Sequence, residues 1–215
     1  MISSRNVWLT VALALAMLVV ACGGASDDGD EATSADAPAA TATEAAAGIQ
    51  RTYAAAPPMT IDVSHGFEAV LLTENGEIRI ELLPADAPGY VNNFVFLARN
   101  DFYDGLTFHR VIAGFMAQGG DPEGQGFGGP GYNLIEEKNE LEFGVGVLSM
   151  AKAAQVSGSQ FFITLAATPF LEGDFTVFGQ VIEGLDVLQQ ITVREPGPDA
   201  LPASRIIDIE IVETP

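Results

Sequence analysis

From residue 61 onward the sequence predicts a mainly β fold, a closed β-barrel capped by two α-helices. Short apolar runs recur along this region, and glycine-rich loops separate them. An Asn75-Gly76 pair stands between two such runs and is a strong signal for a β-hairpin. Apolar residues recur at helical spacing in two segments, which we expect to form the capping helices.

The first hairpin and the first helix follow from residue patterns. Residues 67–73 form an apolar strand before the turn, and residues 77–82 alternate polar and apolar as a half-buried strand does. The next apolar residues recur at helical spacing, and proline suits the first turn of a helix. We therefore expect an amphipathic helix over residues 88–100.

The remaining elements are short apolar runs between glycine-rich loops. A second short helix is expected over residues 185–191, and residues 206–212 are expected to form the closing strand. The other strand candidates span residues 107–112, 115–118, 145–150, 160–165 and 177–181.

The N-terminus has the pattern of an export signal. Arg5 precedes an apolar run over residues 7–21, which is short for a membrane span of about 20 residues but matches the apolar core of a signal peptide. The run ends at Ala21-Cys22 and resembles a bacterial lipoprotein signal over residues 1–21. This resemblance implies a lipid on Cys22, cleavage before it, and a location in the bacterial cell envelope, on the extracytoplasmic side of a membrane. A simple secretory signal and an uncleaved anchor are the alternatives.

Between the signal and the domain the composition changes. Residues 22–60 are rich in Ala, Thr, Asp and Glu and poor in large apolar residues, so we expect a flexible tether. Residues 61–215 form the expected folded domain.

The net charge of the chain limits the classes of molecule that it is expected to bind. The formal net charge is -20, and residues 61–215 alone carry 23 acidic and 7 basic side chains. An acidic surface repels phosphate backbones, so nucleic acid is not expected as a partner. Cys22 is the one cysteine, which excludes a disulfide within the chain.

Three segments carry polar residues in a distinctive pattern. Residues 108–120 have the sequence FHRVIAGFMAQGG, in which Arg110 and Gln118 alternate with bulky apolar residues. Residues 158–163 have the sequence GSQFFI, and a Phe-Leu pair at 170–171 is followed by VFG at 177–179.

The order of these segments, their spacing and the residues in them resemble the sequence motifs of the cyclophilins, and the resemblance extends over about residues 67–212. The resemblance implies an eight-stranded antiparallel barrel closed by two helices, with a groove on its outer face. It also implies a peptidyl-prolyl cis-trans isomerase without metal or cofactor. The expected partners are proline-containing segments of unfolded or partly folded exported proteins, and a monomer is expected.

The same resemblance assigns roles to individual residues. Arg110 resembles a donor to the amide nitrogen that pyramidalises as the prolyl bond twists, and its guanidinium stays charged. The implied catalytic set is Arg110, Phe115, Gln118 and Phe162. The implied substrate-binding residues are Met116, Gln160, Ala151, Ala153, Phe170, Leu171 and Phe175.

Three positions depart from the family pattern. Phe170 stands where many eukaryotic members have Trp, which implies weaker cyclosporin binding. Phe175 replaces a common His or Tyr, and Lys152 replaces a common Asn. These departures keep open a second hypothesis, a proline-binding chaperone or scaffold with little turnover.

Other chemistries lack the residues that they need. His109 and His65 are the two histidines, and they stand in no arrangement typical of a catalytic pair, so we expect His109 to be a structural, hydrogen-bonding residue. Residues 124–129 match G-x-G-x-x-G, but no long strand precedes them and no helix follows. They are expected to form a loop beside the groove.

Overall fold

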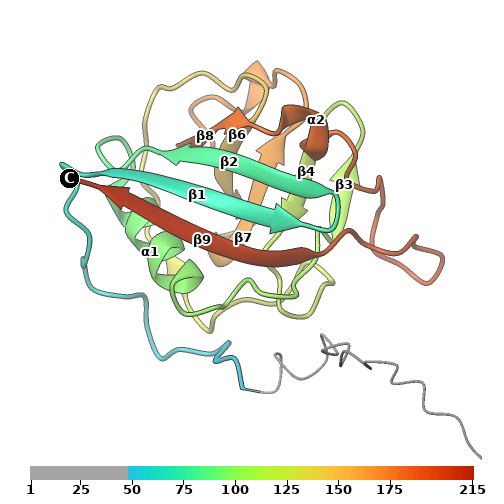
Figure 1. Cartoon of the computed structure of the whole chain (residues 1–215), viewed down its shortest axis with the longest axis horizontal. Helices are drawn as coiled ribbons and strands as arrows, with labels where there is room; N and C mark the ends of the chain where they lie inside the picture. The colour runs from blue at the N-terminus through green and yellow to red at the C-terminus, as the bar shows by residue number, and fades with distance from the viewer. Residues whose placement is uncertain (1–47) are drawn as a thin grey trace, which may run out of the picture. The chain divides into compact units, whose positions relative to one another are not determined.

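The computed structural model describes residues 48–215, and in this part of the chain an antiparallel sheet of nine strands curls around the core with two α-helices (Figure 1). The strand order is β3-β4-β7-β6-β8-β2-β1-β9, and β5 pairs with β7. The elements are β1 (Gly66–Thr73), β2 (Gly76–Leu82), α1 (Pro88–Ala98), β3 (Arg110–Ile112), β4 (Met116–Gly119), β5 (Asn133–Leu134), β6 (Val147–Lys152), β7 (Val156–Thr164), the 3₁₀ turn η1 (Pro169–Leu171), β8 (Val177–Glu183), α2 (Leu185–Leu188) and β9 (Ile206–Thr214).

The predicted hairpin forms between β1 and β2. Its turn pairs Thr73 with Gly76, whose φ of 137° is one that side-chain-bearing residues rarely adopt. Along β2, Ile78, Ile80 and Leu82 are buried while the residues between them are not. The alternation in the sequence therefore predicts which face of this strand meets the core.

Helix α1 covers the core as its spacing predicts. Its apolar side chains are buried apart from Phe96, which is partly buried, and proline occupies its first turn. The carboxylate of Glu137 accepts hydrogen bonds from the backbone N–H groups of Gly89 and Tyr90, each at 2.9 Å. These bonds satisfy amide groups that a helix leaves unpaired at its start. Helix α2 is shorter than the expected span of 185–191.

The expectation of a closed eight-stranded barrel is wrong in closure and in strand number. Within residues 48–215, the edge strands β3 and β9 share no ladder, and only isolated bridges cross the seam, at Thr107–Arg205 and Val111–Arg194. The chain between the two bridges on this side, residues 195–204, is a loop without strand that contains Pro196, Pro198 and Pro202, and proline has no N–H to donate. The sheet is thus a curled half-barrel.

The end of the predicted tether contacts the domain. We call residues 51–60 the strap. Within it, Tyr53 packs its ring against Phe96 at a centroid distance of 5.3 Å, and Thr60 donates its N–H to the Asn92 side chain at 2.8 Å. The last residues of the predicted tether therefore make specific contacts with the domain, through a partly buried aromatic ring and a hydrogen bond.

The signal peptide, Cys22 and most of the tether lie outside the described residues. Among residues 48–215 no helix combines the length and the hydropathy needed to cross a membrane. The same range contains no cluster of His, Cys, Asp or Glu side chains with the size needed to hold a metal ion.

Candidate functional site

The register of β3, β4 and β7 aligns the polar residues that the sequence singles out. Arg110 pairs with Gln118, and Gln118 pairs with Phe162. Residues directly paired in an antiparallel sheet point to the same face. Because side chains alternate along a strand, Met116 and Gln160 point to that face as well. Strand pairing alone therefore places these five side chains together.

The residues between them point to the opposite face and form the core. Val111, Ala117, Phe161 and Ile163 are each at most 1% exposed and belong to the main apolar cluster. The aligned row therefore lies on the outer face of the curled sheet, as the resemblance implied.

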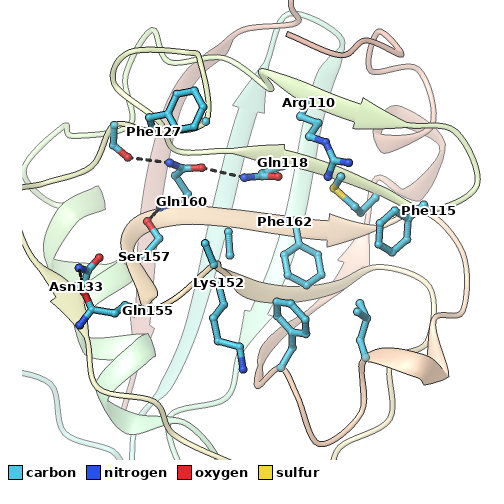
Figure 2. A pocket seen from close by; sticks show the side chains of 17 residues that line it. Arg110, Phe115, Gln118, Phe127, Asn133, Lys152, Gln155, Ser157, Gln160 and Phe162 are labelled. Atoms are coloured by element: carbon cyan, nitrogen blue, oxygen red, sulfur yellow. Dashed lines mark hydrogen bonds between the residues drawn. The ribbon is translucent and has the colours of Figure 1, made fainter.

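A cavity of about 400 Å³ opens on this outer face (Figure 2). Figure 2 shows Phe115 and Phe162 at one end of it and Asn133 and Gln155 at the other. The lining residues are Arg110, Phe115, Met116, Gln118, Gly126, Phe127, Gly128, Asn133, Ala151, Lys152, Ala153, Gln155, Ser157, Gln160, Phe162, Leu171 and Phe175.

The end near Phe162 is an apolar pocket. Phe162 meets Phe175 edge-on at a centroid distance of 5.6 Å and stacks on Phe143 at 6.4 Å. Met116 and Leu171 are buried in the same small apolar cluster. Such a pocket accepts a compact apolar ring and has no group that could act as a nucleophile.

Hydrogen bonds orient the glutamines beside this pocket. Gln118 donates from Nε2 to Oε1 of Gln160 at 2.9 Å, and Gln160 donates from Nε2 to the carbonyl of Gly128 at 2.8 Å (Figure 2). The amide orientation of Gln118 leaves its oxygen free of this chain of bonds. The site thus presents an ordered amide next to the Arg110 side chain.

The two cations that line the cavity each meet a carboxylate. Arg110 donates from Nε to Oε2 of Glu195 at 3.1 Å. The ammonium of Lys152 lies 2.9 Å from Oε1 of Glu136 and 5.2 Å from the centroid of the Phe175 ring. These contacts and a hydrogen bond to the carbonyl of Asp174 therefore hold the partly exposed Lys152 side chain in place beside the cavity.

The glycine-rich segment 124–129 contributes a wall of the groove, as predicted, and no helix follows it. We call residues 121–131, which lie between β4 and β5, the glycine-rich loop. Its first residue, Asp121, accepts backbone hydrogen bonds from Glu123 at 2.8 Å, from Gln125 at 3.0 Å and from Gly126. Burial opposes the charge of Asp121, yet these bonds together keep its pKa below the ordinary value. The charged carboxylate thus fixes the start of the loop.

His109 is buried beneath this loop and does not line the cavity. Burial lowers the pKa of its imidazole, with neighbouring charges as smaller causes. Neither ring nitrogen has a hydrogen-bond partner among residues 48–215. The burial of His109 agrees with a structural residue, but the hydrogen bonds expected of it are absent among the described residues.

The structure brings all of the predicted catalytic and substrate-binding residues together except Phe170. Leu171 is 8% exposed and lines the cavity, whereas Phe170 is 69% exposed and packs outside it, 5.7 Å from the Phe115 ring. Successive residues of a 3₁₀ turn point about 120° apart, so η1 sends these neighbours in different directions. Phe170 is therefore not a lining residue.

Several lining residues were not predicted as site residues. Phe127 sits inside the glycine-rich loop that the sequence analysis placed beside the groove, and an aromatic residue in that loop was the available signal. The polar residues of the far end carry no motif of their own: strand pairing joins Asn133 to Ser157, and a side-chain hydrogen bond joins Asn133 to Gln155 in the turn between β6 and β7. These unpredicted residues are Gly126, Phe127, Gly128, Asn133, Gln155 and Ser157.

Comparison with known proteins covers nearly the whole domain. A family model described as cyclophilin type peptidyl-prolyl cis-trans isomerase/CLD matches residues 69–213. A peptidyl-prolyl cis-trans isomerase of Synechococcus elongatus is 54% identical over 114 residues, which cover 53% of this chain and 79% of that protein. Peptidyl-prolyl cis-trans isomerase B of Bacillus subtilis is 50% identical over 125 residues, 57% of this chain and 87% of that protein.

Solved structures of proteins described in the same way are similar to the fold of this chain. A crystal structure of a cyclophilin type peptidyl-prolyl cis-trans isomerase from Cryptosporidium parvum superposes with a TM-score of 0.63 at 32% identity, over 70% of this chain and 99% of that one. A second structure of that protein, in the presence of the dipeptide Ala-Pro, gives 0.61 at 34% identity, over 68% and 98% of the two chains.

Proposed function

The chain belongs to the cyclophilin-type peptidyl-prolyl cis-trans isomerase family, and we propose that it accelerates X-Pro isomerisation in exported or envelope proteins as they fold. The family makes it an isomerase that needs no cofactor. The observation that carries the mechanism is the position of Arg110, paired with Gln118 and beside the apolar pocket of Phe162.

The reaction sets clear requirements for such a site. A prolyl bond isomerises over a barrier of about 20 kcal/mol, because rotation breaks the amide resonance. The nitrogen becomes pyramidal and basic only at the twisted transition state. A donor aimed at that nitrogen therefore stabilises the transition state more than the ground state.

In this account Arg110 is the donor. A guanidinium has five N–H donors, so it can donate a hydrogen bond to the nitrogen without transferring a proton to it. Its Nε is engaged by Glu195, and the terminal N–H groups are left to point into the groove.

The apolar pocket would bind the proline ring. Phe115, Met116, Phe162 and Leu171 would enclose the ring and keep one side of the twisting bond fixed. The related Cryptosporidium protein was crystallised in the presence of Ala-Pro, which supports a proline-sized ligand for such a groove.

The two glutamines and the two alanines beside the pocket, which we call the backbone strip, would bind the substrate backbone. Gln118 and Gln160 form an oriented pair, while Ala151 and Ala153 have side chains small enough to let a peptide approach the β6 backbone. The residues before proline would lie along this strip.

The cellular setting rests on the N-terminus. The apolar run of residues 7–21 and Cys22 support export and a lipid anchor, which would keep the domain near emerging envelope proteins. We would express the full chain and Cys22→Ser in a bacterium with radiolabelled acyl lipid. Label and membrane association that depend on Cys22 support the proposal, while an unlabelled, freely soluble wild-type protein contradicts it.

Activity on exported clients requires a separate test. We would follow the slow, proline-limited refolding phase of a secreted protein with and without the full chain. A faster slow phase supports the proposed role, and an unchanged slow phase alongside rapid isomerisation of short peptides contradicts it.

A further inference from the structure

We propose that the strap, residues 51–60, is a positioning element of the active site that fixes the glycine-rich wall of the groove from its outer side. The family match begins at residue 69, so the strap lies outside it. The inference rests on the proposed function for its meaning in peptide binding, but its structural part can be tested without activity.

The strap is fastened to the domain by Arg51. Its guanidinium donates to the carbonyl of Phe102 at 2.5 Å and to the carbonyl of Asp104 at 2.6 Å. The same group lies 5.9 Å from the centroid of the Phe102 ring. Burial lowers the pKa of Arg51, opposed by the nearby charge of Asp104. A cation placed on two carbonyls and a ring fixes the direction in which the strap leaves the domain.

Tyr53 connects the strap to the glycine-rich loop. Its ring lies against Phe96 and Phe102, with centroid distances of 5.3 and 6.5 Å. Its backbone N–H donates to the carbonyl of Pro130 at 2.8 Å. A Cβ on Gly131 would lie 2.8 Å from the Tyr53 carbonyl, and the φ of Gly131 is +93°. The strap and the loop therefore approach so closely that glycine is required at the contact.

From this contact a chain of hydrogen bonds leads to the groove. Tyr132 donates its hydroxyl to Oδ1 of Asn93 at 2.7 Å, and Asn93 donates from Nδ2 to the carbonyl of Gly158 at 2.8 Å. Asn93 is 1% exposed, and its bond to Gly158 is buried, whereas the bond from Tyr132 is partly buried. Asn133 follows directly and pairs with Ser157, and both line the cavity.

The inner side of the same loop forms the groove wall. Gly126, Phe127 and Gly128 line the cavity, and Gln160 donates to the Gly128 carbonyl from within. Asp121 fixes the start of the loop, whereas the strap contacts its end at Pro130. Phe127 is 91% exposed, so the packing of its own side chain does not fix the wall.

The expected consequence is a change in peptide binding. Arg110 lies on β3 and has no contact with the strap, so loosening the wall leaves the donor in place. Wall contacts act on the bound peptide and on its transition state alike, and their loss raises KM with little change in kcat.

The test uses the full chain with Tyr53→Ala, compared with Tyr53→Phe and Leu188→Ala. Tyr53→Phe keeps the ring and removes a hydroxyl that has no hydrogen-bond partner among residues 48–215. Leu188→Ala truncates a buried side chain on α2, which packs on β2, and serves as a control for lost stability. If Tyr53→Ala does not fold, Arg51→Gln carries the same test.

We expect Tyr53→Ala to raise KM for an Ala-Pro peptide about three- to tenfold, the loss typical of less preorganised binding, with kcat within about twofold. Amide exchange should accelerate at residues 125–132. Tyr53→Phe and Leu188→Ala should show neither effect.

Unchanged KM and unchanged loop exchange in Tyr53→Ala would overturn the inference, as would equal effects from Leu188→Ala. If the wild-type chain does not isomerise the peptide, the proposed function fails. Amide exchange of the loop then still decides whether the strap fixes the wall.

Discussion

Arg110 donates a hydrogen bond from Nε to the carboxylate of Glu195 at 3.1 Å, so the proposed catalytic cation is tied to a loop that follows α2. The position of Glu195 is set by its neighbour, because Val111 and Arg194 exchange backbone hydrogen bonds at 2.7 and 3.0 Å. The loop that crosses the seam of the half-barrel therefore contributes a residue to the site.

Glu195→Gln should lower kcat about two- to fivefold, because an exposed ion pair contributes roughly 0.2–1 kcal/mol to the orientation of its partners. KM should change less than kcat, and added salt should reduce wild-type kcat toward that of the variant. Exchange spectroscopy on an Ala-Pro peptide gives both constants. An equal or higher kcat in the variant would mean that Glu195 does not orient Arg110.

Phe115→Ala should raise KM about tenfold, since part of the roughly 1.5–3 kcal/mol available from burying an apolar group is lost with the pocket wall. Phe170→Ala is the matched control, because this ring contacts Phe115 from outside the cavity. We expect less than a twofold change in KM for the control. Equal effects of both substitutions would place Phe170 in the binding site after all.

Stability should depend on pH through Asp104. Burial, with the charges of Asp208 and Asp101, raises the pKa of this carboxyl to about 6. The folded state then binds the proton more tightly than the unfolded state, so stability falls as pH rises from about 4, the ordinary value for Asp, to about 6.

Asp104→Asn keeps the shape and removes this titration. Its melting temperature should exceed that of the wild type at pH 7, and the difference should shrink toward zero near pH 4. Thermal unfolding of both proteins across this range measures the difference directly. A difference that is constant with pH would exclude Asp104 as its source.

Much of the site was predictable because strand alternation and register are regular. Arg110 and Gln118 lie on neighbouring antiparallel strands that are joined by a short turn, and they pair directly across it. Directly paired residues point to the same face of a sheet, so both side chains reach the groove. Phe170 and Leu171 show where this reasoning fails. They lie in a 3₁₀ turn, where neighbours in the sequence point in different directions.

The sequence predicts the fold class correctly, but it does not predict that the barrel stays open. Apolar alternation predicts strands, whereas closure depends on long-range pairing of the edge strands, which meet here only in isolated bridges on either side of the loop of residues 195–204. The strap was missed for a different reason. The prediction of a flexible tether rests on the average composition of residues 22–60. Such an average carries no information on the contacts of single residues, and those of Arg51 and Tyr53 are with residues far away in the sequence.

The central claim is that Arg110 stabilises the twisted prolyl bond. The most direct measurement is the cis-trans exchange rate of an Ala-Pro peptide with the full chain and with Arg110→Ala, together with the peptide affinity of each. We predict strong acceleration by the wild type and a loss of about 10²–10³ in kcat/KM in the variant, the size typical of removing one transition-state donor. Acceleration that survives in Arg110→Ala would contradict this mechanism, and wild-type binding without acceleration would make the chain a proline-binding module instead.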